Sequence, residues 1–474
     1  DLSDIGLFGL SPRANNLAVN LALKGVSVTV GNRSSDMIKE CMKLCEKKGV
    51  EELVTGVKDA SEFCSMLSSP RKVLLLGKRG SSIEKNISKV LPCLEEGDIL
   101  VDGSGEGFET CIRRSKECEE KGIRYLTICV LGTDKEVLKG CGFLISGDRS
   151  AYDELEVILK KASREVEYES CLCYVGSSVS ASYVEMVLNG MITAEEESLS
   201  ESYGMLLSAG FTNEEVSKSV SGWNKEELEG PMIENMATVL RKKEDDDDGF
   251  VIDKVCDNEH VLEEANALFR ESNDRRMNVS SISMGVSKAY VSECMENRQK
   301  LSETVKEPSF SWQKLDHVQL VEDLRNAVTC SIIMSTIQAF TMIQAASNDY
   351  EWSINCSEVI RVIVASSIGR CGVLETVKNA LEKESVNALM DEEVCEILQK
   401  KQMSWRRVVG LSVISGVSMP VISSSLSSFD YGRREKLPQN LIVAQHDYYE
   451  SSLFERIDMP RGMSYHCRWT KDHE

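Results

Sequence analysis

The chain has 474 residues, 42% of them hydrophobic and 28% charged, a balance typical of a globular protein long enough for two or three domains. Its formal net charge of -21 argues against nucleic acid or an anionic membrane surface as a partner. No run of about 20 apolar residues indicates a membrane span. The 17 cysteines lack the spacing of metal ligands, so we expect reduced thiols, no metal site, and a soluble protein of the cytoplasm or an organelle matrix.

The first 34 residues predict a strand, a tight turn, a helix and a second strand. Gly9, Ser11 and Ala14 occupy the three small-residue positions of the G-x-G-x-x-G/A pattern, which places a dinucleotide pyrophosphate on a helix N-terminus. Because the middle residue is Ser, the pattern alone fits an ordinary βαβ unit equally well. Arg33 follows the second strand, where an arginine suits the 2′-phosphate of NADP, so NADP(H) is the favoured ligand.

Short apolar strands then alternate with helical segments. We expect strands over residues 73–76, 99–102, 125–130 and 142–147. This order predicts an α/β Rossmann-like domain over residues 1–178, with a parallel, doubly wound sheet. Ligands of such sheets bind at the carboxyl ends of the strands, where Gly9, Lys78 and a Gly-rich turn that begins at Gly103 all fall.

From residue 179 the pattern becomes helical. A long helix is expected over 180–209, and further helical stretches over 318–346 and 359–381, which together predict a large all-α domain over residues 179–437. The charged run at 242–248 is typical of a solvated loop. Residues 438–474 form a polar, aromatic tail that we expect to dock on a partner surface.

This order of parts resembles the decarboxylating 6-phosphogluconate dehydrogenases over nearly the whole chain. The resemblance is carried by segments such as Met186-Val187-Leu188-Asn189-Gly190, and also by residues 5–10, 32–34, 70–72, 97–103, 222–225, 404–407 and 437–445. It implies an NADP-dependent homodimer whose tail completes the partner's site, and an enzyme that oxidises the 3-hydroxyl of 6-phosphogluconate and then decarboxylates the ketone. The cofactor contacts that it implies, together with the turn residues, are Gly9, Ser11, Ala14, Asn32, Arg33, Ser34 and Lys78.

The positions that carry the family's proton chemistry differ in this chain. The family places a lysine base just before its Met-Val-His-Asn-Gly motif and a glutamate acid two residues after it. Those positions read Glu185 and Ile192 here, and the adjacent phosphate-binding tyrosine reads Thr193. The motif's histidine reads Leu188, and only Asn189 is retained.

Other contacts that the resemblance implies are missing as well. An asparagine that touches cofactor and substrate reads Gly105, and a Ser-Gly-Gly turn reads Leu131-Gly132-Thr133. The phosphate-binding arginine reads Ala289 beside Lys288, and in the tail an arginine and a histidine read His446 and Ser452. Since arginine contacts are a principal way of holding a sugar phosphate, we expect this pocket to repel one.

Three hypotheses follow. The first is a catalytically degenerate family member with a structural or regulatory role, as a homodimer or as a subunit of a larger complex. The second is an active 6-phosphogluconate dehydrogenase or related hydroxyacid dehydrogenase with relocated catalytic groups. The third is an NADP(H)-binding sensor without turnover, in which Pro12, Arg13 and Arg79 crowd the nucleotide loops or, in the case of the arginines, add phosphate contacts.

Overall fold

The computed structural model describes residues 1–76, 81–259, 264–383 and 387–470, so Lys78 and Arg79 lie outside the described residues. The chain forms two compact units, Asp1–Ser425 and Leu426–Glu474. The first contains a sheet region followed by a helical region, as expected. The boundaries at residues 178 and 437 remain a prediction.

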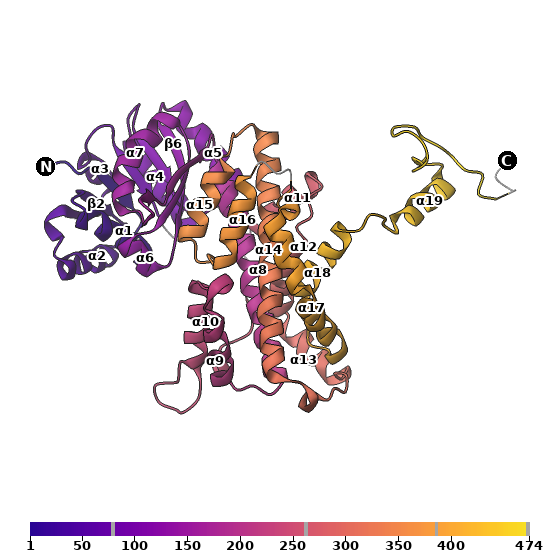
Figure 1. Ribbon diagram of the computed structural model, residues 1–474. Coiled ribbons are helices and arrows are strands. Elements are labelled where there is room, and N and C mark those ends of the chain that lie inside the picture. Colours follow the sequence, from indigo (N-terminus) through magenta and orange to yellow (C-terminus); the bar gives the residue numbers. More distant parts are fainter. Residues whose placement is uncertain (77–80, 260–263, 384–386, 471–474) are drawn as a thin grey trace. The chain divides into compact units, whose positions relative to one another are not determined.

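An eight-stranded sheet organises the N-terminal region (Figure 1). Its strands lie in the order β10-β7-β6-β5-β4-β1-β2-β3. All neighbours are parallel except β6 and β7, which pair antiparallel. The strands are β1 (Ile5–Phe8), β2 (Val28–Gly31), β3 (Val54–Val57), β4 (Lys72–Leu75), β5 (Ile99–Asp102), β6 (Arg124–Leu131), β7 (Gly142–Gly147) and β10 (Leu172–Gly176).

The eight-stranded sheet is thus largely parallel, as the sequence predicts, with one antiparallel pair, β6 and β7. Between β6 and β7 the chain has only residues 132–141, with the short helix α6 (Asp134–Lys139). A parallel crossover needs a dozen or more residues, so β7 returns beside β6 in the opposite direction. A two-stranded hairpin, β8 (Glu165–Val166) and β9 (Glu169–Ser170), precedes β10.

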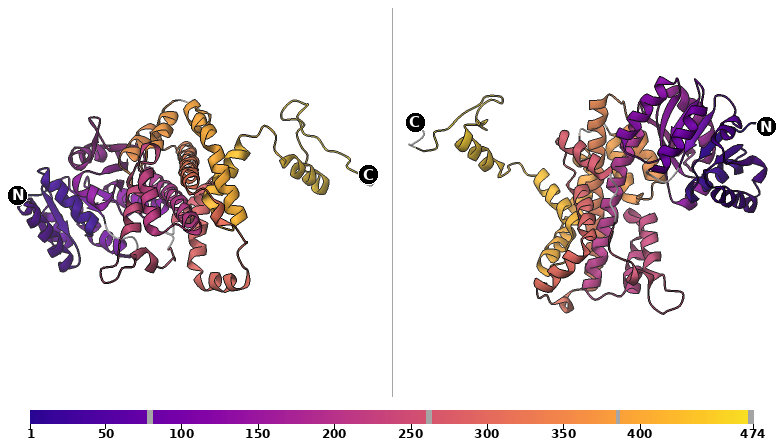
Figure 2. Two further views of the ribbon diagram at one scale, coloured as in Figure 1. Left: turned by 60° about the horizontal axis from the view of Figure 1, so that its bottom comes forward. Right: turned by 180° about the vertical axis from the view of Figure 1, so that it is seen from behind.

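Both faces of the sheet are covered, because alternate strand residues enter two different cores (Figures 1 and 2). In β4, Val73 and Leu75 join one core while Leu74 joins the other. The first core includes residues of α3 (Ala60–Ser65), α4 (Ser81–Val90), α5 (Phe108–Glu120) and α8 (Ser180–Ser208). The second includes residues of α1 (Pro12–Leu23), α2 (Ser35–Lys48), α6 and α7 (Arg149–Ala162).

The helical region is built around two long helices, α8 and α14, that run side by side (Figure 2). The expected helix over 180–209 is confirmed as α8. Around this pair the chain forms α9 (Asn213–Trp223), α10 (Pro231–Arg241), α11 (Glu264–Asp274), α12 (Ser280–Glu293), α13 (Met295–Thr304), α14 (His317–Tyr350), α15 (Cys356–Ser366), α16 (Gly372–Glu382), α17 (Glu392–Ser415) and α18 (Pro420–Gly432).

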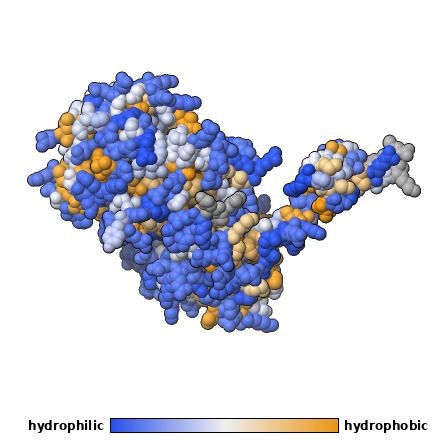
Figure 3. Space-filling view, turned by 45° about the horizontal axis from the view of Figure 1, so that its top comes forward, coloured by the Kyte–Doolittle hydropathy of each residue, from blue (hydrophilic) through white to orange (hydrophobic). Residues whose placement is uncertain are grey.

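Helix α14 is long and apolar enough, by length and composition, to cross a bilayer. Polar side chains such as Thr329, Ser331 and Gln338 interrupt it, so it contains no uninterrupted run of about 20 apolar residues, in agreement with the sequence-based expectation. Moreover, 89% of its apolar window is buried against the rest of the protein. Helix α14 thus owes its apolar character to its place in the core of the helical region, and Figure 3 shows that hydrophilic side chains predominate on the face drawn there.

The expected helix over 359–381 is two helices, α15 and α16, separated by residues 367–371. Two glycines explain the break. A Cβ on Gly369 would lie 2.5 Å from a carboxylate oxygen of Glu195 in α8, and one on Gly372 would lie 2.1 Å from the carbonyl oxygen of Glu226. The chain turns where these close approaches occur.

One carboxylate organises the described part of the tail around α19 (Gln439–Glu450). Asp447 is fully buried and accepts hydrogen bonds from the Leu453 and Cys467 amides at 3.1 Å each and from the Trp469 indole at 2.8 Å. Its carboxylate lies 2.9 Å from Nδ1 of His466. Burial raises the pKa of Asp447, but these partners outweigh it and lower the pKa to about 2.

We expect the tail to lose its order in the Asp447→Asn variant at neutral pH, because the ionised carboxylate holds both ends of the segment. In the wild type its folded-state pKa of about 2 lies below the value of about 3.9 for an exposed aspartate. Asp447 therefore stabilises the tail fully above about pH 4, and this contribution is lost as the pH falls toward 2.

Hydrogen exchange over residues 447–469 measures the effect. The matched control is Asp458→Asn, since Asp458 is 57% exposed and pairs only locally with Arg456. Equal protection of the tail amides in the two variants would contradict the role of Asp447.

Candidate functional site

The turn after β1 has the geometry of a nucleotide-binding turn. Gly9 has a φ of 94°, which a side chain would strain, and its amide donates to the Gly31 carbonyl at 2.8 Å. Ser11 caps α1, and its hydroxyl accepts the Ala14 amide at 3.2 Å. The amide of Leu10 donates to Oδ1 of Asn32 at 3.1 Å, so the ends of β1 and β2 are joined.

Arg33 follows β2 at the same edge of the sheet and is half-buried. Among the residues that the structure describes, its guanidinium has no ion-pair or hydrogen-bond partner. Ser34 is exposed and is the N-cap residue of α2, although its side chain makes no capping hydrogen bond. Of the other predicted cofactor contacts, Ser34 lies beside Arg33, whereas Lys78 lies outside the described residues.

Pro12 and Arg13 occupy the first turn of α1. Pro12 has no amide hydrogen, so it offers no donor to a phosphate. The Arg13 guanidinium contacts the carbonyl oxygens of Val130 and of Gly132, the latter at 2.9 Å, and lies 3.3 Å from Asp134. In this structure Arg13 thus directs both of its terminal nitrogens to the end of β6, while the idea that it adds phosphate contacts stays a prediction.

The residues at the family's catalytic positions form one stripe along α8. Glu185, Asn189 and Ile192, continued by Glu196 one turn farther on, recur at helical spacing and are among the half-buried or exposed positions of a helix that is otherwise largely buried. Helix α8, which the structure describes completely, contains five glutamates and no Lys, Arg or His. The helix therefore contributes carboxyl groups to the stripe and no ammonium or imidazole group.

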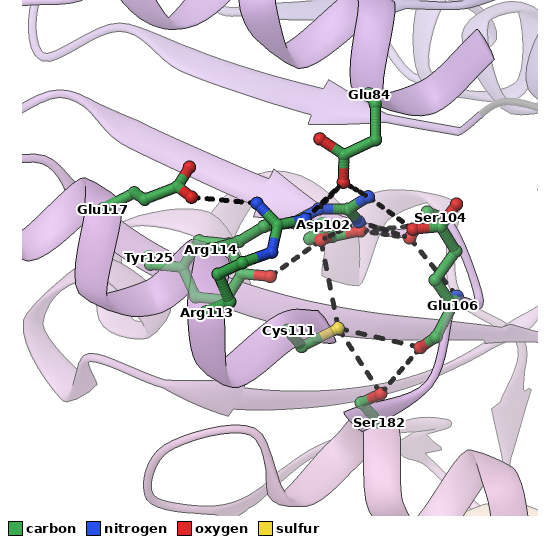
Figure 4. Close-up of polar contacts among 10 residues, drawn as sticks. All are labelled: Glu84, Asp102, Ser104, Glu106, Cys111, Arg113, Arg114, Glu117, Tyr125 and Ser182. Carbon is green, nitrogen blue, oxygen red and sulfur yellow. Dashed lines mark hydrogen bonds and ion pairs between the residues drawn. The ribbon is translucent and has the colours of Figure 1, made fainter. Parts of the chain in front are cut away.

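The turn at residues 103–107, after β5, is held by a buried ion pair (Figure 4). The Arg114 guanidinium lies 2.9 Å from Asp102, and both side chains are 1% exposed. Asp102 also accepts from the Ser104 hydroxyl at 2.6 Å and from the Tyr125 hydroxyl at 2.7 Å. Arg114 further donates to Glu84 at 2.6 Å and pairs with Glu106.

Opposing effects set the protonation of this cluster. Burial raises the pKa of Asp102, but Arg114 and the hydroxyl groups of Ser104 and Tyr125 more than offset burial and hold that pKa below its ordinary value. Burial and the Asp102 charge raise the pKa of Tyr125 well above its ordinary value. The cluster therefore consists of a permanent ion pair and a neutral phenol, which position the turn and do not exchange protons near neutral pH.

The turn and α8 are linked directly. The Ser182 hydroxyl, one helical turn before Glu185, donates to the Glu106 carbonyl at 3.1 Å, and the Cys111 thiol lies 3.5 Å from the same hydroxyl. On α8, Ile192 lies against Gly369 in the loop between α15 and α16, since a Cβ on that glycine would lie 3.2 Å from Ile192. The stripe thus faces the strand-end turns at its beginning and the 367–371 loop farther along.

The same loop also reaches the end of β6. Arg370 pairs with Glu136, whose side chain forms a capping box with Thr133 at the start of α6. Burial raises the pKa of Glu136, but Arg370 and the Thr133 amide lower it below its ordinary value. The predicted substrate turn at residues 131–133 is therefore fixed from both sides, by Arg13 and by the Glu136–Arg370 pair.

The basic residue near the expected phosphate site is already neutralised. Lys288 lies 2.9 Å from Glu197 and 3.9 Å from Glu201, both on α8. Ala289 is buried. Lys288 thus serves as the counter-ion of α8 and does not substitute for a phosphate-binding arginine.

Sequence reasoning missed the Arg114 cluster and the partners of Arg13 and Arg370. Arg114 had a signal in the sequence, because Cys111, Arg114 and Cys118 share one helical face and all three are buried. The contacts of Arg13 and Arg370 had no signal in the local sequence, since their partners lie 117 and 234 residues away in the chain.

Comparisons with known proteins agree with this arrangement. A model of the NAD binding domain of 6-phosphogluconate dehydrogenase matches residues 4–176, and one of that enzyme's C-terminal domain matches residues 181–469. The chain is 33% identical over 471 residues to 6-phosphogluconate dehydrogenase, decarboxylating 1, of Oryza sativa subsp. japonica. It is 32% identical over 474 residues to that of Spinacia oleracea, and each comparison covers 98% of both chains.

A solved structure gives the same result. The Plasmodium falciparum 6-phosphogluconate dehydrogenase, determined in its apo form and with its cofactor NADP+ or its substrate 6-phosphogluconate, is similar with a TM-score of 0.90 and 30% identity. The similarity covers 98% of this chain and 100% of that one. With both of its regions matched in order, this chain belongs to the 6-phosphogluconate dehydrogenase family.

Proposed function

We propose that this chain is a catalytically inactive member of the family, which binds NADP(H) and has a structural or regulatory role as a homodimer or as a subunit of a larger complex. The observation that carries the proposal is the composition of α8, which holds no Lys, Arg or His in any of its residues. In the same proposal, residues 1–178 form the nucleotide domain, 179–437 the helical domain and 438–474 a tail that docks on a partner. The compartment is the cytoplasm or an organelle matrix.

The proton chemistry of oxidative decarboxylation supports this reading. Oxidation of a hydroxyl requires a base, and the carbon left after loss of CO2 requires an acid. The family positions for these roles hold Glu185, which is anionic when ionised, and Ile192, which carries no proton. A carboxylate at the base position cannot polarise the ketone as an ammonium does, so both halves of the reaction lack a group.

Electrostatics disfavour the family's substrate as well. A sugar phosphate carries about two negative charges on its phosphate near neutral pH. The α8 stripe presents Glu185 and Glu196, and Lys288 is paired with Glu197. A phosphate at this surface would meet a helix that contains five glutamates and no Lys, Arg or His, so α8 itself supplies no cation to hold it.

The nucleotide edge fits NADP better than it fits the sugar phosphate. When bound, NADP supplies the acceptor for a hydride. On this chain, Gly9 and Ser11 would face its pyrophosphate, and the half-buried guanidinium of Arg33, which has no partner among the described residues, would hold its 2′-phosphate. An arginine left without an internal partner is what a phosphate site provides before its ligand arrives.

Replacing Arg33 with alanine is expected to weaken NADP+ binding about 10- to 100-fold, since a hydrogen bond to a charged group contributes about 1.5–3 kcal/mol. NAD+ has no 2′-phosphate, so its affinity should change little. Isothermal titration with both nucleotides measures the difference. The control is Lys39→Ala, which removes an exposed cation on α2 paired with Asp36. An equal loss for both nucleotides would exclude a 2′-phosphate contact.

One side chain favours the alternative of a relocated acid. Glu196 lies one turn beyond Ile192 on the same stripe, and partial burial together with the carboxylates of Glu259 and Glu197 raises its pKa to about 7. Such a group could donate a proton near neutral pH. If the protein turns over, Glu196→Gln should abolish that activity, while the neighbouring Ser200→Ala should not.

The activity assay separates these functions. Purified chain, NADP+ and 6-phosphogluconate should yield no NADPH absorbance under conditions in which the Oryza sativa relative is active. Sustained turnover would overturn the proposal. Native mass spectrometry of the protein purified from its own cells tests the assembly, with a complex or dimer expected and a monomer contradicting it.

A further inference from the structure

Three side chains on one face of α1 attach this helix to the segment after β6. Arg13, Asn16 and Asn20 recur at i, i+3 and i+7. Asn16 donates to the Asp134 carbonyl at 2.7 Å, and Asn20 donates to the carbonyls of Val137 and Ala162 at 2.9 and 3.0 Å. The position of Arg13 at the head of this row is thus fixed by the packing of α1 on α6.

The acceptors of Arg13 are equally fixed. Gly132 has a φ of 113°, and a Cβ there would lie 3.0 Å from Glu136. The capping box of Thr133 and Glu136 and the Arg370 pair hold the following turn. The Arg13 side chain is only 32% exposed, so its guanidinium is a built-in part of this edge of the sheet.

The sheet topology shows what this guanidinium obstructs. The strand order reverses at β1, which lies between β2 and β4. A dinucleotide in such a sheet lies across the crevice at this point, with its adenosine half toward the end of β2 and its other half over the strands beyond β4. Arg33 lies at the adenosine end, whereas Arg13 reaches from α1 to the end of β6, across the other end.

We propose that Arg13 occupies the nicotinamide end of the crevice, so that this chain recognises NADP(H) through its adenosine 2′-phosphate half alone. The inference rests on the proposed NADP binding. A nicotinamide ring would have to displace a guanidinium that makes contacts with two carbonyls and one carboxylate. A bisphosphorylated adenosine nucleotide would leave these contacts intact.

Isothermal titration of the full chain with 2′,5′-ADP, NADP+ and nicotinamide mononucleotide tests the proposal. We expect 2′,5′-ADP and NADP+ to bind within about threefold of each other and the mononucleotide not to compete with NADP+. A wild-type preference for NADP+ of about tenfold or more would overturn the inference while leaving NADP binding in place. Absence of binding by both adenosine nucleotides would overturn NADP binding and the inference together.

Variants sharpen the test. Arg13→Met should raise NADP+ affinity about tenfold and change 2′,5′-ADP affinity little, because only the nicotinamide half gains room. Asn16→Ala removes the hydrogen bond from Asn16 to the Asp134 carbonyl and leaves Arg13 in place. It should not change the ratio of the affinities for NADP+ and 2′,5′-ADP. An unchanged ratio in a folded Arg13→Met protein would contradict the proposal, and the wild-type ratio decides the matter even if that variant does not fold.

Discussion

Replacing Arg114 with alanine is expected to lower the free energy of unfolding by about 3–5 kcal/mol, the usual effect of removing one partner from a buried ion pair. Arg114 and Asp102 are both 1% exposed. Without the guanidinium, the Asp102 carboxylate keeps neutral donors alone, namely the amide and hydroxyl of Ser104, the hydroxyl of Tyr125 and the thiol of Cys111, in a medium that solvates charge poorly. The turn at residues 103–107 would lose its support at the same time.

Arg113 is the matched control. It is the adjacent residue and also pairs with Glu84, but its side chain is 51% exposed. Chemical unfolding followed by circular dichroism should give a loss below about 1 kcal/mol for Arg113→Ala. Combining Arg114→Ala with Asp102→Asn should recover part of the stability, because the second change removes the stranded charge. Equal losses for the two single arginine variants would refute the buried-pair account.

The second large effect is expected at Trp405, in the segment that carries part of the family resemblance. Trp405 is fully buried in α17, and its indole N–H donates to the Ile422 carbonyl of α18 at 3.1 Å. The start of α18 is also held by Glu201 of α8, whose carboxylate accepts the Val421 and Ile422 amides at 2.7 and 3.0 Å. Trp405→Ala should therefore cost about 3–5 kcal/mol through cavity formation and the lost hydrogen bond.

Trp405→Phe keeps most of the buried ring and loses the indole donor, so its cost should be smaller, about 1–3 kcal/mol for the unsatisfied carbonyl and the lost volume. Trp469→Ala, in the tail, should leave the main unfolding transition unchanged, since Trp469 belongs to the separate unit Leu426–Glu474. A loss for Trp405→Ala no larger than that for Trp469→Ala would show that this segment does not anchor α18.

The sequence predicted those elements whose pattern is local. Strands such as β4 and β5 are short apolar runs because both faces of the sheet are covered, and the stripe of Glu185, Asn189 and Ile192 follows from helical spacing alone. Strand β3 went unnoticed, because its central Thr55 and Gly56 are exposed and interrupt the apolar pattern. The break between α15 and α16 depends on close approaches to Glu195 and Glu226 that no local pattern records.

The site residues also fall into those that a local sequence pattern predicts and those that only long-range packing positions. The small residues of the first turn and Arg33 could be placed from the βαβ pattern, and the structure brings them to one edge of the sheet. The locking of the β6 end by Arg13 and Arg370 could not, since each arginine meets its partner only through the packing of distant elements. If Arg13 occupies the nicotinamide end of the crevice as proposed, long-range polar contacts of this kind decide what the nucleotide edge can accept.

A single-turnover experiment tests the absence of proton-handling groups most directly. The full chain, in excess over 6-phosphogluconate, is mixed with saturating NADP+, and NADPH absorbance is followed for hours. A chain whose α8 offers neither base nor acid at the family positions should produce no NADPH. A burst of NADPH stoichiometric with the added sugar phosphate would contradict it.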